Sequence, residues 1–158
     1  MPGGSIIVYL IQSEIPTIIR YMEVAGLSFW RLLTVKIDGP FARAHDKGVV
    51  IKHKQLGWYT KGNGRVRKPD PYIDDLIESR TPSEDKKYDR WAQSPYEAEY
   101  YISKLTLPNE TVLDPMMGSG TTGITALQLK RKFIGIEINS KNFEVAKANI
   151  VRSENYTC

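Results

Sequence analysis

The fold is decided by residues 111–138, which read TVLDPMMGSGTTGITALQLKRKFIGIEI. An apolar run ends at Asp114, a glycine-rich turn follows, and apolar residues at helical spacing lead to a second apolar run that ends near Glu137. The pattern predicts strands and helices in alternation: strand 111–114, helix 121–130, strand 132–138 and helix 141–152. Alternating strands and helices are typical of an α/β fold with a parallel sheet.

The glycine turn predicts a nucleoside-binding site. Residues 118–123, GSGTTG, match the pattern G-x-G-x-x-G between a strand and a helix. Glycines let the backbone approach a ligand closely, and Glu137 at the carboxyl end of the second strand is placed to accept both ribose hydroxyls. A glycine turn by itself can be simple strand-to-helix geometry. A carboxylate that ends an apolar strand is harder to explain by packing, so the combination favours an adenosine-like ligand.

A nicotinamide cofactor is the less favoured interpretation of this turn. Nicotinamide proteins normally need strands after the second one, and only 21 residues follow Glu137. A nucleotide unit at the C-terminal end of the sequence therefore argues against a dehydrogenase.

A helix over residues 95–105 precedes the glycine unit. Ser94 and Glu97 have the spacing of a capping box, with Pro95 at the first helical position. The tyrosines of this helix suit a core and its rim better than a platform for stacking bases. They are Tyr96, Tyr100 and Tyr101.

The N-terminal part predicts a further α/β layer. Residues 5–10 are β-branched and apolar on both faces, as in a strand in the middle of a sheet. A helix capped by Ser13 and closed by Gly26 should follow. Residues 62–92 are rich in Gly, Pro and charge, and only Ile73, Leu76 and Ile77 could anchor a short helical turn there. Further strands are expected over 29–37, 48–51 and 55–61.

Charge is distributed unevenly along the chain. Residues 1–68 carry 11 basic and 4 acidic side chains, whereas residues 69–158 carry 11 and 14. The basic excess gathers between Arg43 and Lys68, around Trp58 and Tyr59, which suits a phosphate backbone. Most such clusters are simply a solvated edge strand and loop, so both interpretations stay open.

Composition sets outer limits on function. Apolar residues make up 41% and charged residues 25% of the 158-residue chain, which is typical of a soluble globular domain. The longest apolar run, 6–11, is far too short for a membrane span and no leader precedes it, so we expect a cytoplasmic protein. Cys158 stands alone, so neither metal nor redox chemistry is expected. His45 and His53 have no paired Asp or Cys, so a structural role is favoured over that of a general base.

The glycine motif resembles that of a known enzyme family. Residues 112–122, VLDPMMGSGTT, are similar to D-P-F-x-G-S-G-T-T, the S-adenosylmethionine motif of the DNA amino-methyltransferases that modify adenine or cytosine. Met116 stands where that family has Phe, and both fill an apolar site. The resemblance continues through 131–137, RKFIGIE, and backwards through Gln93-Ser94-Pro95, and it covers residues 93–152.

The resemblance implies a fold and a domain order. The fold would be α/β, the Rossmann-like fold of S-adenosylmethionine-dependent methyltransferases, with a mixed sheet, helices on both faces and an incomplete N-terminus. The single domain 1–158 would run in permuted order: a sheet half over 1–61, a short target-recognition insertion over 62–92 and a cofactor half over 93–158. The function implied is site-specific methylation of DNA, as in restriction-modification.

Two sets of site residues follow from the resemblance. The residues expected to bind S-adenosylmethionine are Ser94, Asp114, Met116, Gly118, Ser119, Gly120, Thr121 and Glu137. The family likeness also strengthens the DNA interpretation of the basic stretch. The residues expected to face DNA are Arg43, Lys47, Lys61, Arg65, Arg67 and Lys68.

No residue of this sequence is assigned a catalytic role. The resembled family frees the amine lone pair with a [D/N/S]-P-P-[Y/F/W] loop, and the nearest matches, DPY at 70–72 and SPY at 94–96, lack the second proline. The family places that loop before the strand that here begins at Ser5. We therefore expect the loop, with a central strand between the strands at Ser5 and Thr111, on a second chain or an upstream segment. The alternatives are a binding module without catalysis and, less favoured, a nicotinamide-dependent oxidoreductase.

Overall fold

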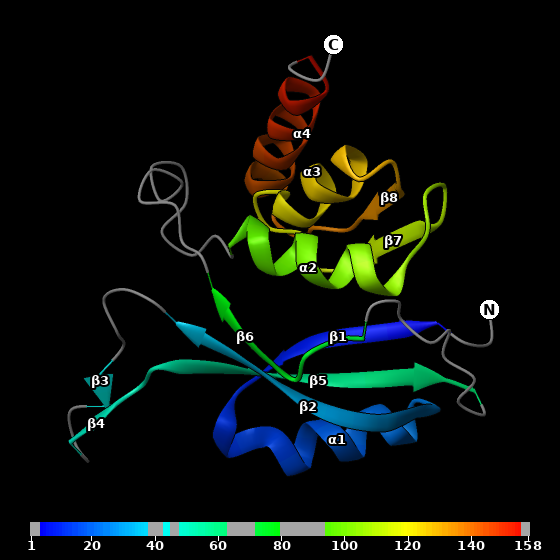
Figure 1. Ribbon diagram of the computed structural model, residues 1–158. Helices are drawn as coiled ribbons and strands as arrows, with labels where there is room; N and C mark the ends of the chain where they lie inside the picture. Colours follow the sequence, from blue (N-terminus) through cyan, green and yellow to red (C-terminus); the bar gives the residue numbers. More distant parts are fainter. Residues whose placement is uncertain (1–3, 38–42, 45–47, 63–71, 80–93, 156–158) are drawn as a thin grey trace. The chain divides into compact units, whose positions relative to one another are not determined.

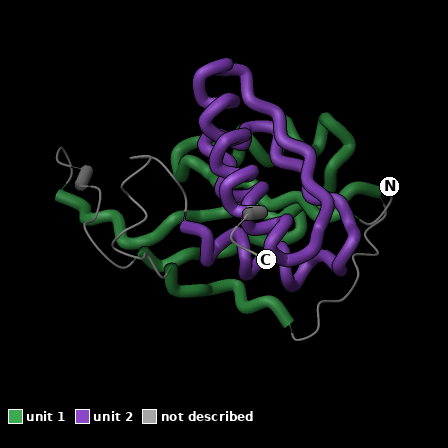
Figure 2. Tube along the Cα trace, turned by 90° about the horizontal axis from the view of Figure 1, so that it is seen from above, with its two compact units in different colours: residues 1–80 green, residues 81–158 purple. Residues whose placement is uncertain are grey.

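The computed structural model describes residues 4–37, 43–44, 48–62, 72–79 and 94–155. The chain divides into two compact units, Met1–Arg80 and Thr81–Cys158, each continuous in sequence (Figure 2). The predicted insertion 62–92 spans the boundary between the two units, and its role remains a prediction.

The first unit is built around a four-stranded mixed sheet (Figure 1). The strand order is β1-β5-β2-β6: β5 pairs antiparallel with β1 and β2, and β6 pairs parallel with β2. A separate pair, β3 and β4, is antiparallel. The elements are β1 (Ser5–Leu10), η1 (Gln12–Glu14), α1 (Ile15–Val24), β2 (Leu27–Ile37), β3 (Arg43–Ala44), β4 (Val49–Val50), β5 (His53–Lys61) and β6 (Leu76–Ser79).

Strand β1 lies at the edge of this sheet, so its predicted place in the middle is wrong for the described residues. Ser5 pairs with Thr60 and Leu10 with Gln55, all on one side of the strand. The side chains are half-buried except for the exposed Tyr9. A β-branched apolar run specifies an extended backbone, but tertiary pairing decides which neighbours the strand acquires.

The core of the first unit lies between β2 and β5. Leu33 and Val35 on β2 and Leu56 and Tyr59 on β5 are almost completely buried. The Tyr59 ring folds back over Gly57, where a Cβ atom would lie 2.6 Å from the ring, so only glycine fits at that position.

Strand β6 replaces the helical turn that the sequence suggested for residues 73–77. Ile77 and Ser79 are buried and their neighbours Leu76 and Glu78 are exposed, an alternation with the period of a strand. Four residues are too few to separate a strand period from a helical one, and the parallel pairing with β2 decides the outcome.

Helix α1 ends as predicted but begins differently. Gly26 has φ +81° and donates its N–H to the Glu23 carbonyl, which closes the helix. The predicted cap at Ser13 is wrong, because Ser13 lies inside η1 and Glu14 is the N-cap residue, without a side-chain cap hydrogen bond.

The second unit contains the βαβα order that the sequence predicts (Figure 1). Strands β7 and β8 are parallel, with Leu113 opposite Ile134. Helix α3 is the crossover between them, and it contacts α2 and α4. The elements are α2 (Pro95–Leu105), β7 (Thr111–Asp114), α3 (Thr121–Gln128), β8 (Lys132–Gly135) and α4 (Ser140–Asn155).

The predicted bounds of α2 are confirmed, and Ser94 is its N-cap residue as predicted, but the side-chain hydrogen bond of the predicted capping box is absent. The Ser94 side chain makes no cap hydrogen bond, and the Glu97 N–H bonds to the Ser94 carbonyl instead, at 3.1 Å. Glu97 and Tyr101 point into the unit and are buried, whereas Tyr96 and Tyr100 are half-buried. The expectation that these tyrosines form core and rim is confirmed.

One face of the β7–β8 pair is apolar and open. Leu113, Ile134 and Ile136 lie on this face and are 58%, 53% and 54% exposed. The opposite face packs on the helices, where the Phe133 ring fills the space beside Gly123 of α3. Parallel strands are normally covered on both faces.

Candidate cofactor-binding site

The site is built on the turn between β7 and α3. Gly118 and Gly120 have φ of +53° and +91°, a backbone region that side chains other than glycine rarely adopt. The Gly120 N–H donates to the Met117 carbonyl at 2.8 Å, which closes the turn. The Met117 N–H donates to the Ile136 carbonyl at 3.0 Å and ties the turn to the chain after β8.

Glu137 anchors the same turn from the other strand. Its Oε2 accepts the Gly118 N–H at 3.0 Å, and its Oε1 accepts the Asn139 N–H at 2.9 Å. The carboxylate is half-buried and lies just beyond β8, two residues later than the strand end. A carboxylate offers about four lone-pair positions, so roughly two remain for a ligand. The spacing argument that paired Glu137 with the glycine turn is therefore matched by a direct hydrogen bond.

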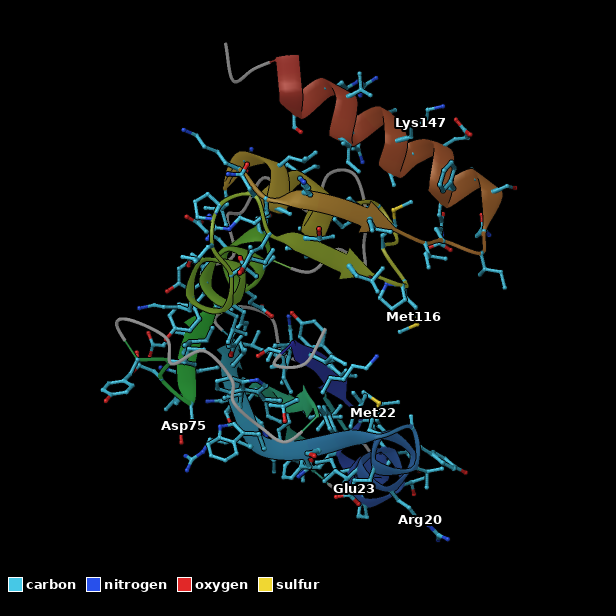
Figure 3. All side chains as sticks on the ribbon, turned by 90° about the vertical axis from the view of Figure 1, so that its right-hand side faces the viewer. Arg20, Met22, Glu23, Asp75, Met116 and Lys147 are labelled. Atoms are coloured by element: carbon cyan, nitrogen blue, oxygen red, sulfur yellow. The ribbon has the colours of Figure 1, made fainter. Side chains whose placement is uncertain are left out.

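Asp114 and Met116 form the rim of the turn. The Asp114 Oδ1 accepts the Met116 N–H at 3.0 Å, so the carboxylate orders the first residues after β7. The Met116 side chain is 79% exposed at the carboxyl end of β7 (Figure 3). An apolar side chain held in the open beside the turn is available to contact the flat face of a ligand.

Helix α4 supports the turn from behind. The Asn149 Nδ2 donates to the Ser119 carbonyl at 3.0 Å. Ala146 is fully buried, and a Cβ atom at Gly120 would lie 3.2 Å from the Ala146 Cβ. The sequence did not predict Asn149 or Ala146 as site residues, although Ala146 falls on the inward stripe of α4, four residues before Ile150. A polar residue beside an inward stripe was the available signal.

Ser94 and Thr121 complete the predicted cofactor set. Thr121 begins α3 directly after the turn, and its carbonyl accepts the Thr125 hydroxyl. Ser94 begins α2 and is 8% exposed. Since α2 and β7 run in opposite directions, the start of α2 lies at the same end of the unit as the turn (Figure 1).

The predicted DNA-facing residues are described only in part. Lys61 is exposed at the end of β5, and Arg43 lies in β3. Lys47, Arg65, Arg67 and Lys68 lie outside the described residues. Of the two histidines, His53 is exposed at the start of β5 and His45 lies outside the described residues.

The described part of the chain contains no group of three or more His, Cys, Asp or Glu side chains that could hold a metal ion. None of its helices combines the length and apolar character that crossing a membrane requires.

Comparison with known proteins identifies the family. A family model described as DNA methylase matches residues 1–148. The chain is 40% identical over 82 residues to the type II methyltransferase M2.LlaDCHI of Lactococcus lactis subsp. cremoris, which is 48% of this chain and 30% of that protein. It is also 40% identical over 100 residues to the type II methyltransferase M.HindIII of Haemophilus influenzae, 61% of this chain and 32% of that protein. The chain belongs to the DNA methylase family.

Solved structures agree with the family assignment. The crystal structure of the M1.HpyAVI–SAM complex superposes with a TM-score of 0.79 at 28% identity, over 95% of this chain and 76% of that chain. The cytosine-N4-specific PvuII DNA methyltransferase has the same fold, with a TM-score of 0.72 at 18% identity. The predicted fold class is confirmed. The matched segments are 30% to 32% of the length of these curated relatives.

Proposed function

We propose that this chain is the cofactor-binding and DNA-recognition part of an enzyme that transfers a methyl group from S-adenosylmethionine to an exocyclic amine of adenine or cytosine in DNA. The observation that carries the proposal is the hydrogen bond between Glu137 and the glycine turn of the DPMMGSGTT motif. It sets a carboxylate with unused lone pairs beside a turn whose glycines leave room for a ligand. Family membership favours this cofactor over a nicotinamide one.

S-adenosylmethionine, when bound, would supply the methyl group of its sulfonium, which would pass to the amine nitrogen of the base as the C–S bond breaks and S-adenosylhomocysteine leaves. The residues of this chain would hold and orient it. Glu137 would accept the ribose hydroxyls, Met116 would cover the purine, and the turn around Ser119 would approach the methionine part. Action on DNA also favours a cytoplasmic location.

The cofactor assignment is tested by replacing Glu137. Glu137→Ala leaves the ribose hydroxyls unpaired and releases the Gly118 N–H, so S-adenosylhomocysteine should bind about 10-fold to 100-fold more weakly, equivalent to a loss of about 1–3 kcal/mol. Calorimetry on the wild type and the variant measures this. Lys147→Gln, on the exposed side of α4, is the matched control and should bind normally. Equal affinities for wild type and Glu137→Ala, or a preference for NAD, would refute the assignment.

Methyl transfer requires a group that this sequence does not contain. The amine lone pair is delocalised into the base and becomes available only when acceptors take the amino protons. No [D/N/S]-P-P-[Y/F/W] tetrapeptide occurs in the 158 residues. We propose that an upstream segment or a second chain supplies it. Leu113, Ile134 and Ile136 form an open apolar face next to an edge of β7 that has no partner strand in the described part of the chain, and this supports the proposal that the segment packs there.

The missing group is tested by complementation. The 158-residue chain should bind cofactor and transfer no methyl group to DNA, as measured with tritiated S-adenosylmethionine. Adding a segment that carries the proline motif should restore transfer, because it supplies the acceptors and a strand for the open edge. Robust methylation by the 158 residues alone would contradict the proposal. Failure with every complement would favour a binding module without catalysis.

The basic stretch supports a DNA-facing surface. The part between Arg43 and Lys68 has eight cations against one acidic residue. Such a stretch attracts phosphates without reading sequence. We assign the DNA contact to this stretch and the recognition role to residues 62–92.

A further inference from the structure

The back of the cofactor turn is held by a side chain from α4. Asn149 lies 30 residues beyond Ser119, yet its amide nitrogen is 3.0 Å from the Ser119 carbonyl oxygen, in a part-buried position. The Asn149 side chain therefore links α4 to the middle of the turn. A hydrogen bond from an exposed asparagine contributes little to stability, whereas the same bond in a partly buried position contributes more.

This bond fixes the orientation of one peptide unit. The Ser119 carbonyl and the Gly120 N–H belong to the same planar unit and point in opposite directions. Asn149 holds the carbonyl, and the Met117 carbonyl accepts the Gly120 N–H at 2.8 Å. The peptide unit between Ser119 and Gly120 is thus held at both ends and cannot rotate without breaking a hydrogen bond.

The peptide unit between Met117 and Gly118, two units earlier, is also held. Its Gly118 N–H donates to Glu137 Oε2 at 3.0 Å. Between these two fixed units lies the Ser119 N–H, which donates to no acceptor in the described part of the chain. Two side chains from different elements therefore set the direction of a backbone donor that is available to a ligand.

The packing beneath the turn matches this arrangement. Ala146 is one helical turn before Asn149 and is fully buried. A Cβ atom at Gly120 would sit 3.2–3.3 Å from Ala146 atoms, which is tighter than an ordinary van der Waals contact. Helix α4 and the turn thus lie in close contact, so a shift of the Asn149 side chain is transmitted to the backbone of the turn.

We propose that Asn149 is a positioning residue for the cofactor: it sets affinity by holding the Ser119 carbonyl, without touching the ligand. The inference rests on the proposed function, because it concerns the same turn. It predicts that a group at position 149 that cannot donate a hydrogen bond weakens cofactor binding. A carboxylate should be worse than a methyl group, because it repels the carbonyl oxygen.

The test measures S-adenosylhomocysteine affinity by calorimetry for wild type, Asn149→Ala and Asn149→Asp between pH ~3.5 and pH ~8, a range that spans the ordinary pKa of Asp. At pH 8, Asn149→Asp should bind about 10-fold more weakly than wild type, and Asn149→Ala about 3-fold more weakly. As the pH falls toward the ordinary Asp pKa of ~4, the dissociation constant of Asn149→Asp should approach that of the wild type, because the protonated carboxyl can donate to the Ser119 carbonyl. The ratio of the Asn149→Ala dissociation constant to the wild-type one should stay constant. Lys147→Gln is the control on the same helix.

The outcomes separate the two proposals. If the wild type binds S-adenosylhomocysteine and both Asn149 variants bind it equally well, this inference is overturned and the cofactor assignment still stands. Weak binding by Asn149→Asp that does not recover at low pH would also overturn it, because the hydrogen bond would not be the cause. No binding by the wild type would overturn the cofactor assignment and this inference with it. Melting temperatures of all variants show whether each is folded at the pH of measurement.

Discussion

In the proposed cofactor site, Glu137 would serve two purposes at once. Its Oε2 orders the turn through Gly118, and its remaining lone pairs would accept the ribose hydroxyls. A turn that is already held before the ligand arrives loses less conformational entropy on binding. Loss of Glu137 therefore removes a ligand contact and loosens the turn that carries the other contacts. The two effects should be coupled rather than additive.

The buried hydroxyl of Tyr101 makes the stability of the fold depend on alkaline pH. Its ring is 6% exposed, and its hydroxyl has no hydrogen-bond partner among the described residues. Burial first, and then the neighbouring Tyr100 and Glu97, raise the pKa of Tyr101 above its ordinary value. The Tyr101 hydroxyl ionises near pH ~10 in the unfolded chain and only at higher pH in the folded chain. Its contribution to the free energy of unfolding is therefore constant below pH ~10, and the stability falls as the pH rises further.

The matched variant is Tyr101→Phe. Removing an unpaired buried hydroxyl should leave the free energy of unfolding at pH 7 unchanged or raise it by about 1 kcal/mol. The variant should also lose less stability than wild type between pH 9 and pH 11. Urea unfolding at both pH values measures the difference. Tyr96→Phe, on the half-buried part of the same helix, is the control and should retain the alkaline loss.

Helix α3 and strand β8 pack closely against each other at Gly123. A Cβ atom at Gly123 would lie 2.5 Å from Phe133 Cε1 and 3.0 Å from Ile150 Cδ1. Glycine inside a helix normally costs about 0.5–1 kcal/mol relative to alanine. Here the clash should win, and Gly123→Ala should lower the free energy of unfolding by about 1–3 kcal/mol.

A double-mutant cycle separates the clash from helix propensity. Adding Phe133→Leu to Gly123→Ala should recover part of the loss, because the smaller side chain vacates the space. Gln128→Ala, at an exposed position of α3, should have little effect. An increase in stability for Gly123→Ala alone would show that the Phe133 ring moves aside freely.

The elements that could be predicted share strong local signals. Helix α2 begins at a proline and carries apolar residues at helical spacing, so both of its ends were predicted correctly. The glycine turn and the place of Glu137 beside it could be predicted because few other structures require those residue types at that spacing. Strand β6 is different: four residues carry little period, and its parallel partner β2 is remote in sequence. Long-range pairing of that kind leaves no local trace.

The predicted side-chain caps are absent for a related reason. Ser94 is the N-cap residue of α2 as predicted, whereas Ser13 lies inside η1. A side-chain cap hydrogen bond depends on a rotamer and on neighbours that spacing does not specify. The support of the turn by Asn149 was missed for the same cause, since only the packing of α4 against the turn brings Asn149 and Ser119 together.

For the whole molecule, the uneven charge predicts how DNA binding depends on salt. Each phosphate neutralised by Lys or Arg contributes about 0.9 to the slope of log affinity against log salt. Replacing Arg65, Arg67 and Lys68 with Gln should therefore reduce that slope by about 2–3, as measured by fluorescence anisotropy between 50 and 200 mM salt. Replacing the exposed Lys132, Lys141 and Lys147 is the charge-matched control and should change it little. An unchanged slope in the first triple variant would assign the basic stretch to a solvated surface.

The continuity of each unit in sequence has a consequence for synthesis on the ribosome. Every strand pair of the first sheet, from Ser5 with Thr60 to Ile37 with Ser79, closes within the first 80 residues. That sheet can therefore form while residues 81–158 are still being translated, which takes roughly 4–16 s at about 5–20 residues per second. During that time the described sheet would have β1 and β6 as its edge strands. Translation speed over the linking segment thus sets how long those edges stay exposed to other nascent chains.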